Sequence, residues 1–325
     1  MENIVIQLVI LVIGFVVLIK GADYFVDGAA AIAKNLRVPD ILVGLTIVAF
    51  GTSAPEMAVS VKAMLSNNSD MILGNVIGSN ILNILLIIGI SAWIFPLKVK
   101  NNTIQKEIPF TFLVSLLLFI LLGDTLFDNG SVNMISRGDG IVILIFFAVF
   151  LYYLITLAKK GEVEEVESKY SLKEASIYTL IGLVCIVVGG NFVVESASKI
   201  AVSMGVGQKF ISLTIVAFGT SLPELVTSVT AAKKQAQDIA IGNIIGSNIF
   251  NICFVVGLPS ALLGNIVPVE AIYTDLMVML IATVALFIFS KSEREVSKKE
   301  GCIFLGMFVI YYIYLIASQF SSVMA

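Results

Sequence analysis

Long apolar runs dominate the sequence, and short segments between them carry most of the charged residues. Apolar runs of about 18 residues or more predict transmembrane helices, because about 20 residues at a rise of 1.5 Å cross the hydrocarbon core of a bilayer. Ten spans are predicted, near residues 3–24, 40–64, 71–95, 107–123, 138–158, 174–198, 209–232, 238–262, 271–290 and 301–319. We therefore expect an all-α integral membrane protein with no separate soluble domain.

Composition agrees with this pattern and excludes several classes of protein. Of the 325 residues, 58% are hydrophobic and only 13% are charged, whereas soluble domains carry about 25% charged residues. A net charge of -3 gives no indication of nucleic-acid binding, and histidine, the commonest transition-metal ligand, is absent. Cys185, Cys253 and Cys302 are far apart in apolar stretches, which is typical of small buried hydrophobes. We expect no cofactor.

The distribution of lysine and arginine predicts the orientation in the membrane. If the N-terminus is outside, sixteen of the 20 basic residues fall at the inner ends of the predicted spans and four at the outer ends. Basic residues accumulate on the cytoplasmic side of membrane proteins. We expect both termini outside the cell membrane and the charged linker 159–173 inside it.

The chain repeats itself at an offset of 168 residues. Leu45–Ser53 and Leu213–Ser221 both read LTIVAFGTS, and the same offset aligns Gly51–Glu56 with Gly219–Glu224. It also aligns GNVIGSN, beginning at Gly74, with GNIIGSN, beginning at Gly242. Each copy holds five predicted spans, an odd number, so the second copy enters the membrane from the opposite side. We therefore divide the chain into a first five-helix repeat at 1–158, the linker 159–173, and a second, inverted repeat at 174–325.

Glu56 and Glu224 are the acidic residues deepest in the predicted spans. A carboxylate there costs roughly 2.5–3.5 kcal/mol on insertion scales, so it indicates a partner or a function. A structural salt bridge is the plain alternative, but no lysine or arginine lies at comparable depth in the sequence. We interpret the two glutamates as functional.

Each glutamate follows a proline and lies close to a glycine and two hydroxyl residues. Pro55 and Pro223 cannot donate the backbone hydrogen bond of a helix, so we expect a break that frees carbonyls near Ala49–Gly51 and Ala217–Gly219. A lone Pro-Gly pair can also be a simple kink, but here the pattern occurs twice and ends in Glu both times. Carboxylate, hydroxyl and carbonyl oxygens suit a hard cation such as Ca²⁺.

The span that follows each glutamate adds an amide-rich face. Asn75, Ser79 and Asn83 have helical spacing, and Asn243, Ser247 and Asn251 repeat it. We expect Asn83 and Asn251 to line the ion site, and Asn75 and Asn243 to satisfy backbone groups. A rival interpretation is close helix packing, because small residues recur four apart at Gly74 and Gly78 and at Gly242 and Gly246. Both interpretations can hold together.

The charge of this site predicts how it works. Two ionised glutamates carry a charge that one Ca²⁺ neutralises, and an empty site would leave two nearby carboxylates in a medium of low dielectric constant. The carrier should therefore return only when Na⁺ or H⁺ replaces Ca²⁺. Exchange is favoured over uniport.

The paired GTSxPE and GNxxGSNxxN segments, in two five-span halves, resemble the repeats of the Na⁺/Ca²⁺ exchanger family, over nearly the whole chain. The resemblance implies a Ca²⁺ site made by Glu56, Glu224 and the carbonyls of Thr52 and Thr220. It implies Na⁺ sites at Ala49, Ser53, Glu56, Ser79, Ala217, Ser221, Glu224 and Ser247. It further implies exchange of three Na⁺ for one Ca²⁺ by alternating access, with the first and sixth spans sliding over a fixed core.

Departures from the family pattern refine this expectation. The linker is short, which is similar to prokaryotic members without a regulatory domain, and Asn at position 251, where some members carry Asp, argues against K⁺ cotransport. The nearest alternative is a Ca²⁺/H⁺ antiporter that uses the same glutamates. An intramembrane protease would need a catalytic carboxylate dyad, and a purely structural membrane protein would not need duplicated buried glutamates. We expect a transporter, not an enzyme, that acts as a monomer in the lipid bilayer without nucleic acid.

Overall fold

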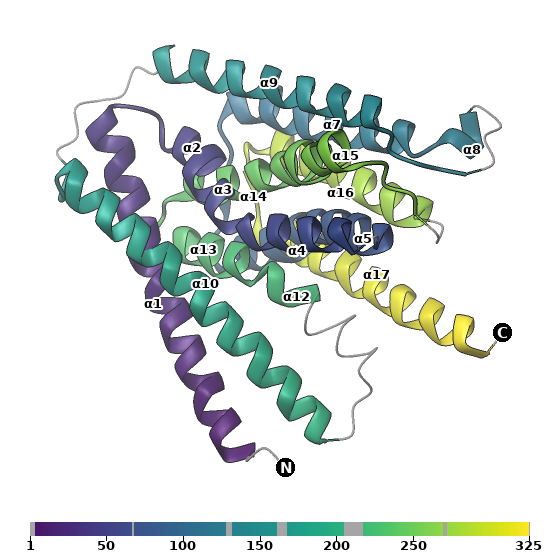
Figure 1. The fold of residues 1–325 in the computed structure, drawn as a ribbon. Coiled ribbons are helices and arrows are strands. Elements are labelled where there is room, and N and C mark those ends of the chain that lie inside the picture. The colour runs from purple at the N-terminus through teal and green to yellow at the C-terminus, as the bar shows by residue number, and fades with distance from the viewer. Residues whose placement is uncertain are drawn as a thin grey trace.

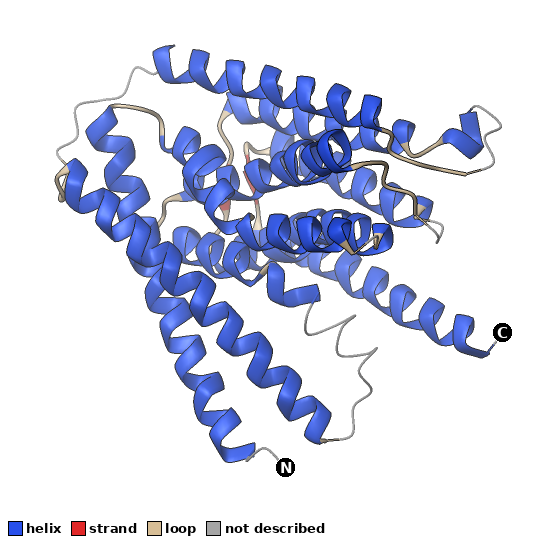
Figure 2. Cartoon of the chain, viewed as in Figure 1, coloured by secondary structure: helices blue, strands red, loops and turns tan. Residues whose placement is uncertain are grey.

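The computed structural model describes residues 4–66, 68–127, 132–160, 168–204, 217–268 and 272–324. Nearly all of these residues are helical, and the strands among them are two short segments that pair with each other (Figure 2). An all-helical membrane fold was predicted, and it is confirmed. The helix count is smaller than predicted within the described part: eight helices are long and apolar enough to cross a bilayer, and one bent pair makes up to nine spans.

The single long helices that could span the membrane are α1 (Ile4–Leu36), α9 (Arg137–Lys160), α10 (Leu172–Ser203), α16 (Tyr273–Ser292) and α17 (Lys298–Met324). The other spans are composite, because short π-helical turns, labelled η, interrupt them. These are α5–η2–α6 (Ser69–Ile81, Leu82–Ile88, Gly89–Ile94), η3–α7 (Thr103–Glu107, Ile108–Leu121) and α14–η5–α15 (Gln237–Phe250, Asn251–Val256, Gly257–Leu263). A short helix, α8 (Asp124–Phe127), follows α7.

The two segments that carry the glutamates are broken helices. The first consists of α2 (Asp40–Val43), η1 (Gly44–Val48), α3 (Ala49–Thr52) and α4 (Ala54–Leu65). The second is described from α12 (Ala217–Thr220) onward and continues as α13 (Leu222–Lys233). The earlier part of the predicted span 209–232 lies outside the described residues. Ten spans therefore remain a prediction.

The first helix is longer than its apolar run. It was predicted to end near residue 24, but α1 continues to Leu36. The additional turns are rich in alanine and pack along α10, which lies beside α1 over much of its length (Figure 1). Apolarity alone marked the part that crosses the bilayer and could not mark the helical extension beyond it.

Glycines hold α1 and α10 together at backbone distance. Gly14, Gly21 and Gly28 recur every seven residues on α1 and face Gly189, Gly182 and Thr179 on α10. A Cβ on Gly182 would lie 2.5 Å from the backbone nitrogen of Phe25, and one on Gly189 would lie 2.6 Å from that of Leu18. No side chain fits there without moving one helix away from the other.

The composite spans form the centre of the molecule. In Gln237–Leu263, 94% of the most apolar stretch is buried, and in Ser69–Ile94 the value is 72%, against 22% for α1. Gly242 and Gly246 of α14 lie against the first broken helix: a Cβ at Gly246 would be 2.7 Å from the Cβ of Ala49. The corresponding glycines of the first half, Gly74 and Gly78, have no neighbouring atom within 4 Å among the described residues. The counterpart of the segment that Gly242 and Gly246 contact is 209–217, which lies almost wholly outside the described residues.

Two short backbone pairings join the loops of the two halves. The strand β1 (Leu97–Lys98) pairs antiparallel with β2 (Glu295–Val296), and Ile135 forms a bridge with Ile266. Residue 266, in the second pairing, lies 168 positions after residue 98, in the first. One partner of each pairing therefore stands at the same place in its half of the chain. The turn before Ile266 contains Gly264, at a φ of 145° that L-residues rarely adopt.

Candidate functional site

Ser53 marks the break in the first broken helix. The helices before and after it differ in direction by 45°. Pro55, in the first turn of α4, has no N–H, so the carbonyl of Gly51 lacks the partner that a continuous helix would supply. The carbonyl of Ala49, in contrast, accepts the N–H of Ser53 at 3.0 Å. The same carbonyl also accepts the hydroxyls of Thr52 at 3.4 Å and of Ser247 at 3.5 Å. The expectation of freed carbonyls therefore holds only in part.

The second glutamate is held in the same way. Ser221 lies between α12 and α13, Pro223 stands in the first turn of α13, and Glu224 follows it. Ser53 and Ser221 have nearly the same backbone conformation, with φ of -83° and -89°. Glu56 and Glu224 are 0% and 1% exposed. The two breaks thus bring both carboxylates into the interior of the molecule.

Each carboxylate is bonded by the serine of the other copy. The hydroxyl of Ser53 donates to Oε1 of Glu224 at 3.1 Å, and that of Ser221 donates to Oε1 of Glu56 at 3.5 Å. Ser79, on α5, also donates to Oε1 of Glu56, at 3.4 Å. The duplicated segments are therefore two parts of one site.

The threonines and the first asparagine of each amide face lock the helices around the glutamates. The hydroxyl of Thr52 donates to Oδ1 of Asn243 at 3.0 Å, and that of Thr220 to Oδ1 of Asn75 at 3.5 Å. The amide of Asn75 in turn donates to the backbone carbonyl of Glu56 at 3.1 Å, and Asn243 bonds that of Glu224 at 3.5 Å. These asparagines satisfy backbone groups at the breaks.

Ser60 and Ser228 support the same two asparagines, and the sequence interpretation did not include them. Asn75 donates to Ser60 at 3.3 Å and Asn243 to Ser228 at 2.9 Å. Both serines are fully buried and lie four residues after their glutamates, so helical spacing from Glu56 and Glu224 would have found them. They fix the amides and thereby the backbone at each glutamate.

Asn80 and Asn248 form a reciprocal clamp where α5 and α14 cross. The amide of Asn80 donates to the backbone carbonyl of Asn248 at 3.2 Å, and that of Asn248 donates to the carbonyl of Asn80 at 3.4 Å. Their side-chain oxygens accept the amides of Asn83, at 2.9 Å, and of Asn251, at 3.1 Å. The clamp fixes which end of each amide faces the site.

The result is a set of four buried acceptor oxygens with no hydrogen-bond partner among the described residues. They are Oε2 of Glu56, Oε2 of Glu224, Oδ1 of Asn83 and Oδ1 of Asn251. A buried acceptor without a donor is costly, and these four come as two matched pairs. Oxygens of this kind, two of them on carboxylates, match the ligands that hard cations prefer.

No cation of the protein neutralises the site: within the described part of the chain, no lysine or arginine lies within 4 Å of either glutamate. The described residues also contain no group of three or more His, Cys, Asp and Glu side chains placed to hold a metal. A cation here would bind to two carboxylates supplemented by amide, hydroxyl and carbonyl oxygens.

The other residues expected at the site lie nearby. Ser247 is buried on α14, 3.5 Å from both the Thr52 hydroxyl and the Ala49 carbonyl. Ala217 begins α12, one turn before Ser221, as Ala49 begins α3 before Ser53. The structure thus brings the expected residues of both copies to one place.

Comparison with known proteins agrees with this arrangement. The family model described as sodium/calcium exchanger protein matches residues 6–156 and 175–317. The inner membrane protein YrbG of Escherichia coli (strain K12) is 32% identical over 315 residues, which cover 93% of this chain and 94% of that protein. The sodium/calcium exchanger MaX1 of Methanosarcina acetivorans is 31% identical over 350 residues, covering 96% and 99%.

A solved structure has the same fold. It is the sodium-calcium exchanger NCX_Mj soaked with 10 mM Na⁺ and zero Ca²⁺, which superposes with a TM-score of 0.83 at 32% identity, over 96% of this chain and 99% of that one. Members of this family are transporters and not enzymes. The chain is a multi-pass membrane protein that belongs to the sodium/calcium exchanger family.

Proposed function

We propose that this protein exchanges Na⁺ for Ca²⁺ across the cell membrane by alternating access, through the site between the two broken helices. The observation that carries this proposal is the set of four unpartnered oxygens on Glu56, Glu224, Asn83 and Asn251. They lie in a buried region that holds two carboxylates and no neutralising lysine or arginine among the described residues. Such a site suits cations, and membership of the sodium/calcium exchanger family supports Na⁺ and Ca²⁺ as those cations.

Ca²⁺ would be held by both glutamates and by the carbonyls of Thr52 and Thr220, with Asn83 and Asn251 lining the site. Na⁺ would use the glutamates together with Ser53, Ser79, Ser221, Ser247 and the carbonyls of Ala49 and Ala217. The serine bonds between the copies support this division. When an ion takes Oε1 of Glu56 or Glu224, the serine hydroxyl that now donates to it can turn its lone pairs toward Na⁺.

Exchange follows from charge balance. One Ca²⁺ neutralises two carboxylates, and an empty site leaves them unpaired in the interior. Three Na⁺ for one Ca²⁺ is the stoichiometry that we propose, with net movement of charge. One chain contributes both carboxylates, so a monomer suffices, and no cofactor is needed.

The proposed orientation places both termini outside and the loops that form β1 and β2 in the cytoplasm. It rests on the distribution of basic residues. The two halves would have opposite orientations, and α1 and α10 would slide over the central core. The contact between α1 and α10 supports such movement as a pair, because glycines let their backbones touch.

The decisive experiment measures Ca²⁺ uptake into proteoliposomes loaded with Na⁺. An outward Na⁺ gradient should drive uptake, and Glu56→Gln or Glu224→Gln should abolish it. Glu293→Gln, which changes an exposed acid in the loop before β2, is the matched control and should leave uptake unchanged. Uptake that persists in both site variants would refute the assignment of the glutamates.

A Ca²⁺/H⁺ antiporter with the same two glutamates is the second candidate. The carboxylates could alternate between protons and Ca²⁺, and the four unpartnered oxygens fit that cycle as well. The same vesicles separate the candidates: a pH gradient without Na⁺ should drive little uptake if the exchanger uses Na⁺. Equal uptake with a pH gradient alone would assign proton coupling.

A further inference from the structure

A second buried carboxylate lies outside the central site. Glu107, at the end of η3, is 1% exposed, and its Oε2 has no hydrogen-bond partner among the described residues. Its Oε1 accepts the hydroxyl of Tyr153 on α9. No part of the exchange mechanism uses this glutamate.

Glu107 lines a pocket of about 330 Å³ that shares no residue with the central site. Tyr153, Thr103 and Thr156 place further oxygens around the pocket. Thr156 donates its proton to the carbonyl of Tyr152 at 3.0 Å, which leaves its lone pairs available. The pocket is large enough to hold water.

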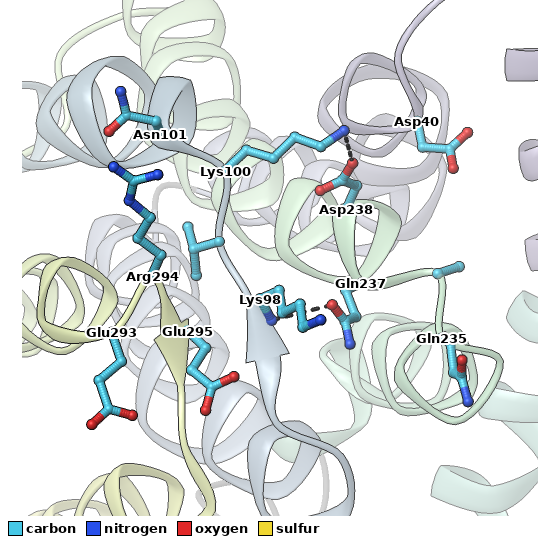
Figure 3. A pocket seen from close by; sticks show the side chains of 12 residues that line it. Asp40, Lys98, Lys100, Asn101, Gln235, Gln237, Asp238, Glu293, Arg294 and Glu295 are labelled. Atoms are coloured by element: carbon cyan, nitrogen blue, oxygen red, sulfur yellow. Dashed lines mark hydrogen bonds and ion pairs between the residues drawn. The ribbon is translucent and has the colours of Figure 1, made fainter. Parts of the chain in front are cut away.

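A second pocket, of about 580 Å³, lies next to this one and shows where the lysine shared by both pockets is bonded. It is lined by acidic and basic residues, among which Lys100 lies 2.5 Å from Asp238, and the backbone N–H of Lys98 donates to Oε1 of Gln237 at 3.2 Å (Figure 3). Lys100 lines both pockets, so this ion pair lies between them. Its ammonium group is engaged there and does not neutralise Glu107.

The other lysine of the smaller pocket makes no ion pair with the carboxylate within 4 Å. Lys106 is exposed, and its Nζ lies 5.8 Å from the centre of the Tyr153 ring. No lysine or arginine of the described chain lies within 4 Å of Glu107. A buried carboxylate with one oxygen held by a hydroxyl donor and the other unpartnered is stabilised by a cation or a proton on the free oxygen.

The surroundings determine which cation fits. Glu107 is the one carboxylate among the residues that line this pocket, so a monovalent cation balances its charge and a divalent ion would leave an excess. A proton would also neutralise Glu107, and the experiment below separates that outcome from a bound cation. A monovalent cation that keeps part of its water satisfies Oε2 and needs only oxygen ligands.

We propose that Glu107 and Tyr153 form a second cation site, which takes a partly hydrated Na⁺ from the pocket between η3, α9 and the start of α2. Pro39 and Ile41 also line this pocket, at the beginning of the broken helix that leads to Ser53. Na⁺ bound here would therefore contact the beginning of the first broken helix, which carries Glu56 farther along. This inference does not depend on the ions that the central site transports.

The test counts bound ²²Na⁺ per chain in purified protein by equilibrium dialysis. Glu107→Gln should remove one Na⁺ per chain from the wild type and also from the Glu56→Gln/Glu224→Gln variant. Glu293→Gln, on the same side of the molecule, should remove none. Loss of Na⁺ in Glu56→Gln/Glu224→Gln tests the central site separately, so the two proposals can fail independently.

Two results would overturn the inference. In the first, Glu107→Gln binds as much Na⁺ as its parent in both backgrounds, with no other change. In the second, Glu107→Gln keeps its Na⁺ but loses the uptake of one proton between pH 8 and pH 6, which would assign a proton to Glu107. If Glu107→Gln does not fold, Glu107→Asp decides, because it keeps the charge but withdraws the carboxylate by one methylene. We expect at least tenfold weaker Na⁺ binding at this site in Glu107→Asp, and unchanged binding would refute the proposal.

Discussion

Ser53 donates a hydrogen bond to Glu224 across 171 residues of sequence, at 3.1 Å. Ser221 makes the corresponding bond to Glu56. Each half of the chain therefore holds the carboxylate of the other half, and neither half contains a complete site. The proposed ion site therefore draws on both copies, through the bonds of Ser53 to Glu224 and of Ser221 to Glu56.

Removing one of these serine hydroxyls should weaken ion binding. Hydrogen bonds to charged groups contribute about 1.5–3 kcal/mol, and about 1.4 kcal/mol corresponds to a tenfold change in affinity. Ser53→Ala should therefore lower the apparent Na⁺ affinity of exchange at least tenfold, measured as the Na⁺ dependence of Ca²⁺ flux. Ser115→Ala is the control, because that buried serine bonds only the carbonyl of Thr111 in its own helix. Equal effects in the two variants would contradict the role of Ser53.

The asparagine clamp of Asn80 and Asn248 should affect Ca²⁺ affinity without contacting the ion, because it orients the amides of Asn83 and Asn251. Asn248→Leu removes the acceptor of Asn83, whose amide can then turn its N–H groups toward the cation. We expect at least tenfold weaker Ca²⁺ binding and a loss of about 1–3 kcal/mol in stability, from buried groups left unpaired. Isothermal calorimetry and thermal unfolding in detergent measure the two effects.

Asn80→Leu should reproduce the Asn248→Leu result, because its side chain accepts from Asn251 in the same way. Asn265→Ala, at an exposed position, is the control. Wild-type Ca²⁺ affinity in both clamp variants would show that the amides keep their orientation without it.

A side chain between α1 and α10 should separate the pair. Gly182→Ala places a Cβ 2.5 Å from the backbone nitrogen of Phe25, and overpacking of this kind costs about 1–3 kcal/mol. We expect a lower unfolding temperature in detergent and slower exchange. Gly306→Ala, at an exposed helical position with no neighbour within 4 Å, should be neutral or stabilising. Slower exchange in Gly306→Ala as well would mean that the glycine contact is not the cause.

The turn at Gly264 should tolerate only glycine. Its φ of 145° is strained for any L-residue, and such strain costs of order 1–3 kcal/mol. Gly264→Ala should therefore lower the unfolding temperature and loosen the bridge between Ile135 and Ile266, seen as faster hydrogen exchange at their amides. Gly138→Ala, in the first turn of α9, should leave both measurements unchanged. Protected amides in Gly264→Ala would refute the link.

Much of this site could be predicted because the motifs that form it occur in both halves of the sequence. The duplicated motif predicted Glu56, Glu224 and the serines beside them, and helical spacing predicted Asn83 and Asn251; the structure brings these residues together, and their binding of ions stays a prediction. Asn80 and Asn248 were missed because they lie off the helical face of Asn75 and Asn83, and the crossing of α5 and α14 that joins them is a tertiary contact. Glu107 was missed because it stands next to a lysine at the end of a span, where an exposed charge is ordinary.

The reciprocal bonds also set the order of assembly during synthesis. Ser221 follows Glu56 by 165 residues, which at about 5–20 residues per second means roughly 8–33 s of translation. During that time Glu56 is already in the chain with the hydroxyl of Ser79 from its own half but without that of Ser221. The nascent first half must therefore keep a buried acid near water, or with its proton, until the second half arrives.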